Sequence, residues 1–107
     1  MLVSTGKILA KARKGRYAVA HFNINNMEIV QGVVEAAVKL NSPIILATSE
    51  GAIKYAGMNF LYSLAETASN LVKIPVALHL DHGQDFEMIK RAIKLGYYSV
   101  MIDASHE

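Results

Sequence analysis

The residues best suited to chemistry lie in the stretch His79-Leu-Asp-His-Gly83. The apolar run over residues 74–78 precedes it and is typical of a buried β-strand. Two imidazoles and a carboxylate therefore follow a predicted strand within four positions. Parallel α/β folds gather their catalytic groups at the carboxyl ends of strands. We interpret this stretch as part of a metal or acid–base site.

The composition sets limits on the class of protein. The chain has 107 residues, is 52% hydrophobic and carries a formal charge of +2. It is expected to form a single domain over residues 1–107, or part of a larger one. It has no cysteine, so disulfides and thiolate metal ligands are excluded. It shows neither a signal peptide nor an apolar run of membrane length, so we expect a soluble, cytoplasmic protein without a membrane partner.

A group of basic side chains near the start could suggest a nucleic-acid partner. It consists of Lys7, Lys11, Arg13, Lys14 and Arg16. Their spacing places them around one helix whose other face is apolar, and the net charge is low. We therefore favour a solvated helix surface and no nucleic-acid binding.

The hydrophobic periodicity predicts alternating helices and strands. Helices are expected over residues 5–14, 27–40, 51–55, 60–72 and 86–95, and strands over residues 17–22, 43–48, 75–80 and 98–102. Ser4, Asp85 and either Asn25 or Asn26 are candidate N-caps, and Gly15 and Gly96 are candidate stops. The intervals between strands leave room for helical crossovers, which favours parallel pairing. The fold class is therefore α/β, with a leading helix and four parallel strands.

The parity of residues along the strands separates two kinds of α/β fold. Near the strand ends, polar groups occupy odd positions: His21, Asn23, Ser49, His79, Asp81, Asp103 and Ser105. Apolar groups occupy even positions: Phe22, Leu46, Leu78, Leu80, Val100 and Ile102. Since side chains alternate between the faces of a strand, one face should pack on helices and the other should carry polar groups at its rim. This pattern favours a barrel of the TIM type over a doubly wound sheet.

Four motifs together resemble the class II, zinc-dependent fructose-bisphosphate aldolases and the related tagatose-bisphosphate aldolases. The motifs are Phe22-Asn23, Ser49-Glu-Gly-Ala52, His79-Leu-Asp-His-Gly83 and Ser99-Val-Met-Ile-Asp-Ala-Ser-His106. The resemblance implies that this chain is the amino-terminal half of a (β/α)8 barrel. It also implies an enzyme of glycolysis and gluconeogenesis that cleaves fructose 1,6-bisphosphate into dihydroxyacetone phosphate and glyceraldehyde 3-phosphate. Zinc would stabilise the negative charge of the enediolate as a Lewis acid.

The resemblance assigns roles to five residues, each with a structural alternative. His82 would be a zinc ligand, or a loop histidine that caps a helix or hydrogen-bonds a carbonyl. Asp81 would be the general acid/base at the C4 hydroxyl of the substrate, or a helix cap. Ser49 would bind the glyceraldehyde 3-phosphate part, or cap a short helix. Asp103 would bind a second divalent metal, or act as a helix cap or as a partner of a ligand. Asn23 would bond the substrate, or complete a turn.

The two remaining histidines at this rim are less defined. We expect His79 to pack or to support a ligand rather than to bind metal. His21 departs from the family pattern, where a small residue is commoner, so its role stays open. His106 matches no family ligand.

Much of an aldolase site is absent from these residues. A catalytic zinc site needs about three protein ligands, and the resemblance places the other two histidines, a glutamate and the phosphate-binding loops in later strands. We therefore predict that the chain alone binds zinc weakly and has no useful aldolase activity. We expect a homo-oligomer or completion by the missing half barrel. The alternatives are a tagatose-bisphosphate aldolase and a catalytically inert half-barrel module that associates with itself.

Overall fold

The computed structural model describes residues 1–105, so the prediction for His106 lies outside the described residues. The helices are α1 (Thr5–Gly15), α2 (Met27–Lys39), α3 (Glu50–Ala56), α4 (Met58–Leu71) and α5 (Phe86–Leu95). The strands are β1 (Ala20–Asn23), β2 (Ile44–Thr48), β3 (Val76–Gly83) and β4 (Ser99–Ile102). The predicted order of a leading helix, three βα units and a fourth strand is confirmed.

The four strands form one parallel sheet in the order β1-β2-β3-β4. Each strand therefore lies beside the next strand in the chain. A doubly wound sheet reverses its order at a switch point, whereas a barrel adds strands in sequence. Because crossovers between parallel strands are right-handed, this order places the crossover helices on one face. The predicted half-barrel arrangement is confirmed.

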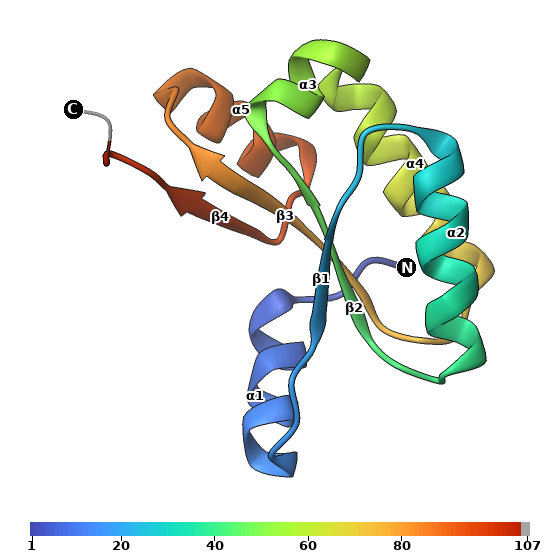
Figure 1. Ribbon diagram of the computed structural model, residues 1–107. Coiled ribbons are helices and arrows are strands. Elements are labelled where there is room, and N and C mark those ends of the chain that lie inside the picture. Colours follow the sequence, from blue (N-terminus) through green and yellow to red (C-terminus); the bar gives the residue numbers. More distant parts are fainter. Residues whose placement is uncertain (106–107) are drawn as a thin grey trace.

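The two faces of the sheet have different neighbours (Figure 1). The even-numbered side chains of β2, and those of β3 as far as Leu80, are buried in the large core beneath the crossover helices, with Leu46 and Leu78 fully buried. On the opposite face, Ile45 and Ala77 pack against Ile8 of α1. Helix α1 therefore covers the amino-terminal half of the odd face and leaves the carboxyl-terminal half to the polar groups.

Side-chain caps define where most helices begin. The N-caps Ser4, Asn26, Ser49 and Asp85 accept hydrogen bonds from the backbone N–H groups of Lys7, Ile29, Ala52 and Glu87. Asn26, not Asn25, caps α2. Gly96 ends α5 with a φ of 128°, as expected of a glycine stop. At the end of α1 the left-handed residue is Arg16 rather than Gly15, which remains in the helix.

Three predicted boundaries were wrong. The first strand begins at Ala20 rather than at residue 17, because the N–H of Tyr17 still bonds to the carbonyl of Ala12 in α1. Helix α4 runs over Met58–Leu71, since Gly57 separates it from α3. Strand β3 continues to Gly83 instead of ending at Leu80, because Gly83 pairs with Ile102 of β4. The polar residues following Leu80 thus belong to the strand.

No helix within residues 1–105 combines the length and the apolar composition that crossing a membrane requires.

Candidate functional site

A β-bulge in β3 organises the site. Leu80 pairs with Val100, but the next pair is Gly83 with Ile102, so β3 contains one residue more than β4 in this interval. His82 adopts a left-handed conformation with a φ of 50°. Such bulges interrupt the alternation of side chains and redirect one of them. As a result Asp81 and His82, although consecutive, converge: Nε2 of His82 lies 3.7 Å from Oδ2 of Asp81.

Gly83 allows the bulge to lie close to its neighbours. A Cβ atom at this position would lie 2.8 Å from Cγ1 of Ile89 in α5 and 3.2 Å from the carbonyl oxygen of Met101. The absence of a side chain therefore lets β3 approach both the helix and the adjacent strand.

Asp103 orients the ring of His82. Its Oδ2 lies 2.9 Å from Nδ1 of His82, while its Oδ1 accepts hydrogen bonds from the hydroxyl and the backbone N–H of Ser105. The hydroxyl of Ser105, then His82, then the N–H of Ser105 lower the pKa of Asp103. Asp103, followed by Asp81, raises the pKa of His82. An ionised Asp103 accepts only, so Nδ1 of His82 donates, and Nε2 is left facing Asp81.

Asp81 contacts a second histidine through its other oxygen. Its Oδ1 lies 3.6 Å from Nε2 of His79. Nδ1 of His79 is hydrogen-bonded to the hydroxyl of Ser99 at 2.6 Å, and that hydroxyl contacts the hydroxyl of Thr5 at 2.8 Å. Burial lowers the pKa of His79, against the opposing effect of Asp81. The ring of His79 is thus fixed from α1 and β4, with Nε2 directed to Asp81.

His21 extends this cluster onto β1. Its ring centroid lies 5.8 Å from that of His79, with an interplanar angle of 68°. His21, His79 and Asp81 each offer one donor atom, and these three atoms lie within 4.8 Å of one another. The sequence left the role of His21 open, and the structure brings it to the rim beside the other two residues.

Ser49 and Asn23 lie at the same edge of the sheet. Asn23 is the last residue of β1, and Ser49 follows β2 directly. The hydroxyl oxygen of Ser49 accepts a hydrogen bond of 3.1 Å from the N–H of Ala52, so Ser49 does cap α3. Its hydroxyl proton remains available for donation. Of the predicted site residues, the structure thus brings Asp81, His82 and Asp103 into contact and places the other two at the rim.

Sequence reasoning missed Glu50. Its Oε2 accepts hydrogen bonds from the N–H groups of Gln84 and Asp85, at 3.0 and 2.7 Å. The carboxylate of Glu50, the first residue of α3, therefore holds the backbone of the segment that connects the bulge to α5. The partners are separated by 34 and 35 residues, so no local pattern could reveal the contact. Ser99 and Thr5 were missed for the same reason, since they meet across 94 residues.

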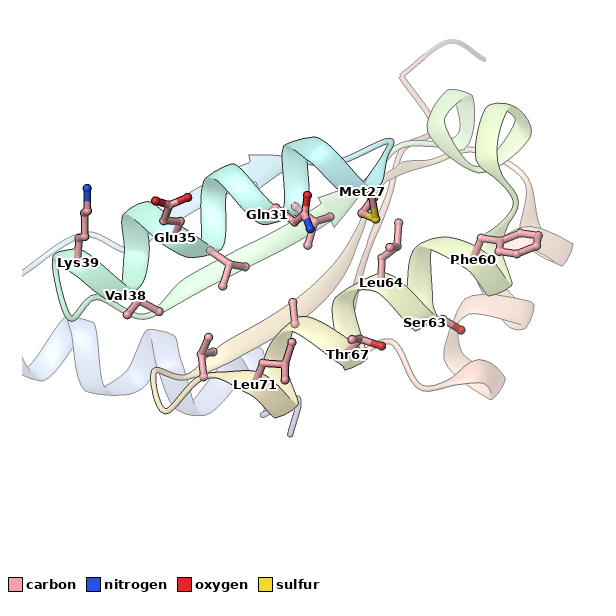
Figure 2. Close-up of a pocket in the computed structure, with 14 residues that line it drawn as sticks. Met27, Gln31, Glu35, Val38, Lys39, Phe60, Ser63, Leu64, Thr67 and Leu71 are labelled. Carbon is pink, nitrogen blue, oxygen red and sulfur yellow. The ribbon is translucent and has the colours of Figure 1, made fainter.

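A separate apolar groove of about 640 Å³ lies between α2 and α4 (Figure 2). Its walls include Met27, Val38, Phe60, Leu64 and Leu71. The groove belongs to the helical layer and includes Glu35 and Lys39 in its lining, whereas His21, His79 and Asp81 lie on the opposite face of the sheet. Its few polar residues do not form a cluster that could carry out acid–base or metal chemistry, so we place the candidate site at the rim.

A sequential parallel sheet with ionisable residues at its carboxyl rim indicates the class of (β/α)-barrel folds. Within that class, this chain belongs to the class II fructose-bisphosphate aldolase family, whose model, described as "Fructose-bisphosphate aldolase class-II", matches residues 3–107. The family predicted from the four motifs is confirmed.

Individual relatives agree with this assignment. The chain is 50% identical to the fructose-bisphosphate aldolase of Giardia intestinalis over 106 residues, which cover 98% of this chain and 33% of the relative. It is 49% identical to that of Thermus caldophilus over 110 residues, covering 100% and 35%. The crystal structure of the YdjI aldolase from Escherichia coli K12 superposes with a TM-score of 0.88 and 32% identity, covering 100% of this chain and 41% of that one. This chain spans about a third of the length of the curated relatives.

Proposed function

We propose that this chain is the amino-terminal part of a zinc-dependent aldolase that cleaves fructose 1,6-bisphosphate into dihydroxyacetone phosphate and glyceraldehyde 3-phosphate. Membership of the family supports the reaction class. The observation that carries the proposal is the convergence of Asp81 and His82 at the bulge, with His82 held by Asp103. A carboxylate that can move a proton thus lies next to an imidazole that is oriented as metal ligands are.

The donor set fits one part of a zinc site. Nε2 of His82 lies 3.7 Å from Asp81 while Nδ1 donates to the carboxylate of Asp103, and such a carboxylate contact is usual for a zinc-bound histidine. The remaining ligands would come from the part of the barrel beyond these residues. Zinc would supply Lewis-acid stabilisation of the enediolate oxygens.

The residues of this chain would act as follows. In the cleavage direction, Asp81 accepts the proton of the substrate's C4 hydroxyl. The C3–C4 bond then breaks, which leaves an aldehyde on the C4 side and an enediolate on the C3 side. The enediolate takes up a proton from solvent at C3 to become dihydroxyacetone phosphate, and Asp81 returns its proton to solvent. The hydroxyl of Ser49 donates a hydrogen bond to the glyceraldehyde 3-phosphate part, and the amide of Asn23 hydrogen-bonds the enediolate. Asp103 orients His82. A second divalent cation at Asp103 would have to share or displace an oxygen that already accepts a hydrogen bond.

The experiment joins residues 1–107 to the complementary part of the Thermus caldophilus aldolase, which completes the barrel. This chimaera should cleave fructose 1,6-bisphosphate in a zinc-dependent manner, whereas the 107-residue chain should not. Asp81→Asn should lower kcat about 10²- to 10⁴-fold while zinc remains bound. Retention of kcat within tenfold would refute the assigned role of Asp81. Assaying tagatose 1,6-bisphosphate in parallel tests the related specificity.

A half-barrel module that associates with itself is the second candidate. Strands β1 and β4 each pair with one neighbour in residues 1–105, and Phe22, Met101 and Ile102 expose 42%, 41% and 71% of their surface. Exposed strand edges with apolar side chains favour association. Mass measurement in solution tests this candidate: a dimer of the 107-residue chain without aldolase activity would support it, and a monomer would exclude it. The homo-oligomer and the cytoplasmic location stay predictions.

A further inference from the structure

We propose that His21, His79 and Asp81 form a binding site for a divalent transition-metal ion, separate from the zinc site proposed around His82. The ligands would be one imidazole nitrogen from each histidine and Oδ1 of Asp81. Two imidazoles and one carboxylate suit Zn²⁺, Fe²⁺ or Co²⁺, whereas Mg²⁺ and Ca²⁺ prefer sites made of oxygen atoms alone.

Barrel geometry explains why residues of β1 and β3 meet. In a (β/α)8 barrel, each layer of interior side chains comes from alternate strands. A shear number of about 8 over eight strands means that residues of one layer are offset from strict register by one residue for each strand crossed. Through β2, His21 is in register with Ala77, because His21 pairs with Ile45 and Ile45 with Ala77. A shift of two residues from Ala77 leads to His79. The ring contact between His21 and His79 agrees with this offset.

The intervening strand leaves space for the contact. Ala47 of β2 pairs with both Asn23 and His79, so a residue with a methyl side chain lies between the two histidine-bearing strands. A larger side chain at that position would separate the rings.

The distances suit a transition-metal ion. A tetrahedral zinc ion with bonds of ~2.0–2.2 Å has ligand atoms roughly 3.4 Å apart. Nε2 of His79 and Oδ1 of Asp81 already lie 3.6 Å apart. His21 is the exposed member of the group, so rotation of its side chain can close the remaining gap, since all three donors lie within 4.8 Å.

The ring of His79 is prepared for coordination. Ser99 holds Nδ1, and Thr5 in turn holds Ser99, which leaves Nε2 as the ligand atom. Supporting groups of this kind orient ligating histidines.

The two oxygens of Asp81 distinguish this site from the one around His82. Oδ1 faces His79, and Oδ2 faces His82. A metal ion held by His21 and His79 would therefore use the oxygen that the His82 side does not contact. Under the proposed function, such an ion would draw electron density from Asp81 and weaken it as a base, so excess zinc should inhibit cleavage.

Co²⁺ binding tests the site, because its visible absorption reports the number and kind of ligands. In the 107-residue chain, His21→Asn should weaken Co²⁺ binding roughly tenfold or more, and His82→Asn should change it less than threefold. Mg²⁺ should not displace Co²⁺. A larger loss in His82→Asn, an equal loss in both variants, or displacement by Mg²⁺ would overturn the proposal. Circular dichroism verifies that each variant is folded.

The chimaera provides a second measurement in a closed barrel. It should bind two Zn²⁺ ions per chain, His21→Asn should bind one, and basal cleavage at one equivalent of zinc should be unchanged in that variant. Inhibition by excess zinc should disappear with His21→Asn. A chimaera that binds a single ion regardless of His21 overturns the proposal even if it is an active aldolase. One that binds two ions but does not cleave the sugar phosphate refutes only the proposed function.

Discussion

Replacement of Glu50 tests how the segment following His82 is held. The two backbone N–H groups of Gln84 and Asp85 donate to one carboxylate oxygen of Glu50. Glu50→Ala removes that acceptor and leaves both donors to water. The segment that connects the bulge to α5 should then open more often, although neither residue of the bulge has been changed.

The magnitude follows from the exposure of these hydrogen bonds. A hydrogen bond contributes about 0.5–1.5 kcal/mol net, and one to a charged group about 1.5–3 kcal/mol. Both bonds to Glu50 are exposed, so the lower part of the range applies to each. Together they should contribute about 1–2 kcal/mol to closing the segment, which corresponds to a factor of about 5–30 in the population of the open state.

Amide hydrogen exchange measures this opening residue by residue. In Glu50→Ala, exchange at Gln84 and Asp85 should accelerate about 5- to 30-fold, whereas amides in the middle of α2 should not change. Glu50→Gln retains an oxygen acceptor and should give a smaller increase. Glu35→Ala, which removes the same charge from an exposed position on α2, is the matched control. Unchanged exchange at both amides in Glu50→Ala would show that Glu50 does not hold this segment.

Three further predictions concern the rim and the core. In the metal-free chain, an NMR titration should give His82 a pKa above 6.5 and His79 one below it, and Asp103→Asn should lower the pKa of His82. Because folding raises the pKa of His82, the contribution of this residue to stability is complete below its unfolded-state pKa and is lost as the pH rises through its folded-state pKa. A lower pKa for His82 than for His79 would contradict the geometry. Thr48 and Tyr97 share a buried hydrogen bond of 2.8 Å, so Thr48→Val and Tyr97→Phe should each cost about 1–3 kcal/mol in urea unfolding. The double variant should cost less than the sum of the two, and additive losses would argue against the bond. Gly83→Ala should destabilise the chain by about 1–3 kcal/mol through contact with Ile89 and the backbone of Met101. At Gly32 the added carbon would meet nothing within 4 Å in residues 1–105 apart from adjacent residues and the backbone of its own helix. Gly32→Ala should therefore stabilise the chain by up to about 1 kcal/mol, and equal effects of the two substitutions would exclude the steric explanation.

The parts of the fold that depend on local patterns could be predicted from the sequence. Side-chain periodicity indicated the alternation of helices and strands, and the odd-numbered polar residues indicated a polar rim on one face. The structure pairs His79 with Ala47 of β2 and Ser99 of β4, and Asp81 contacts His79 on that face. N-caps such as Ser49 and Asp85 were also visible, because a cap bonds to a backbone N–H only two or three residues away.

The β-bulge could not be derived with the same reasoning. Strict alternation places His82, at an even position, among side chains that pack on helices. A polar residue there, followed by a glycine, conflicts with the apolar pattern of Leu78 and Leu80, and this conflict was the available signal. The conformation that resolves it depends on the pairing of β3 with β4, which a pattern within one strand does not contain.

The same bulge explains why so short a segment can carry several kinds of chemistry. In a regular strand, consecutive residues face opposite sides, so Asp81 could meet His79 but not His82. One inserted residue with positive φ brings all three to one side, with one oxygen of Asp81 directed to each imidazole. Each histidine is then hydrogen-bonded at Nδ1 by a different residue. Asp103, which follows β4, holds His82, and Ser99 within β4 holds His79. Strand β4 thus sets the orientation of both imidazoles, and a disturbance of its pairing with β3 would alter both sides of Asp81 together.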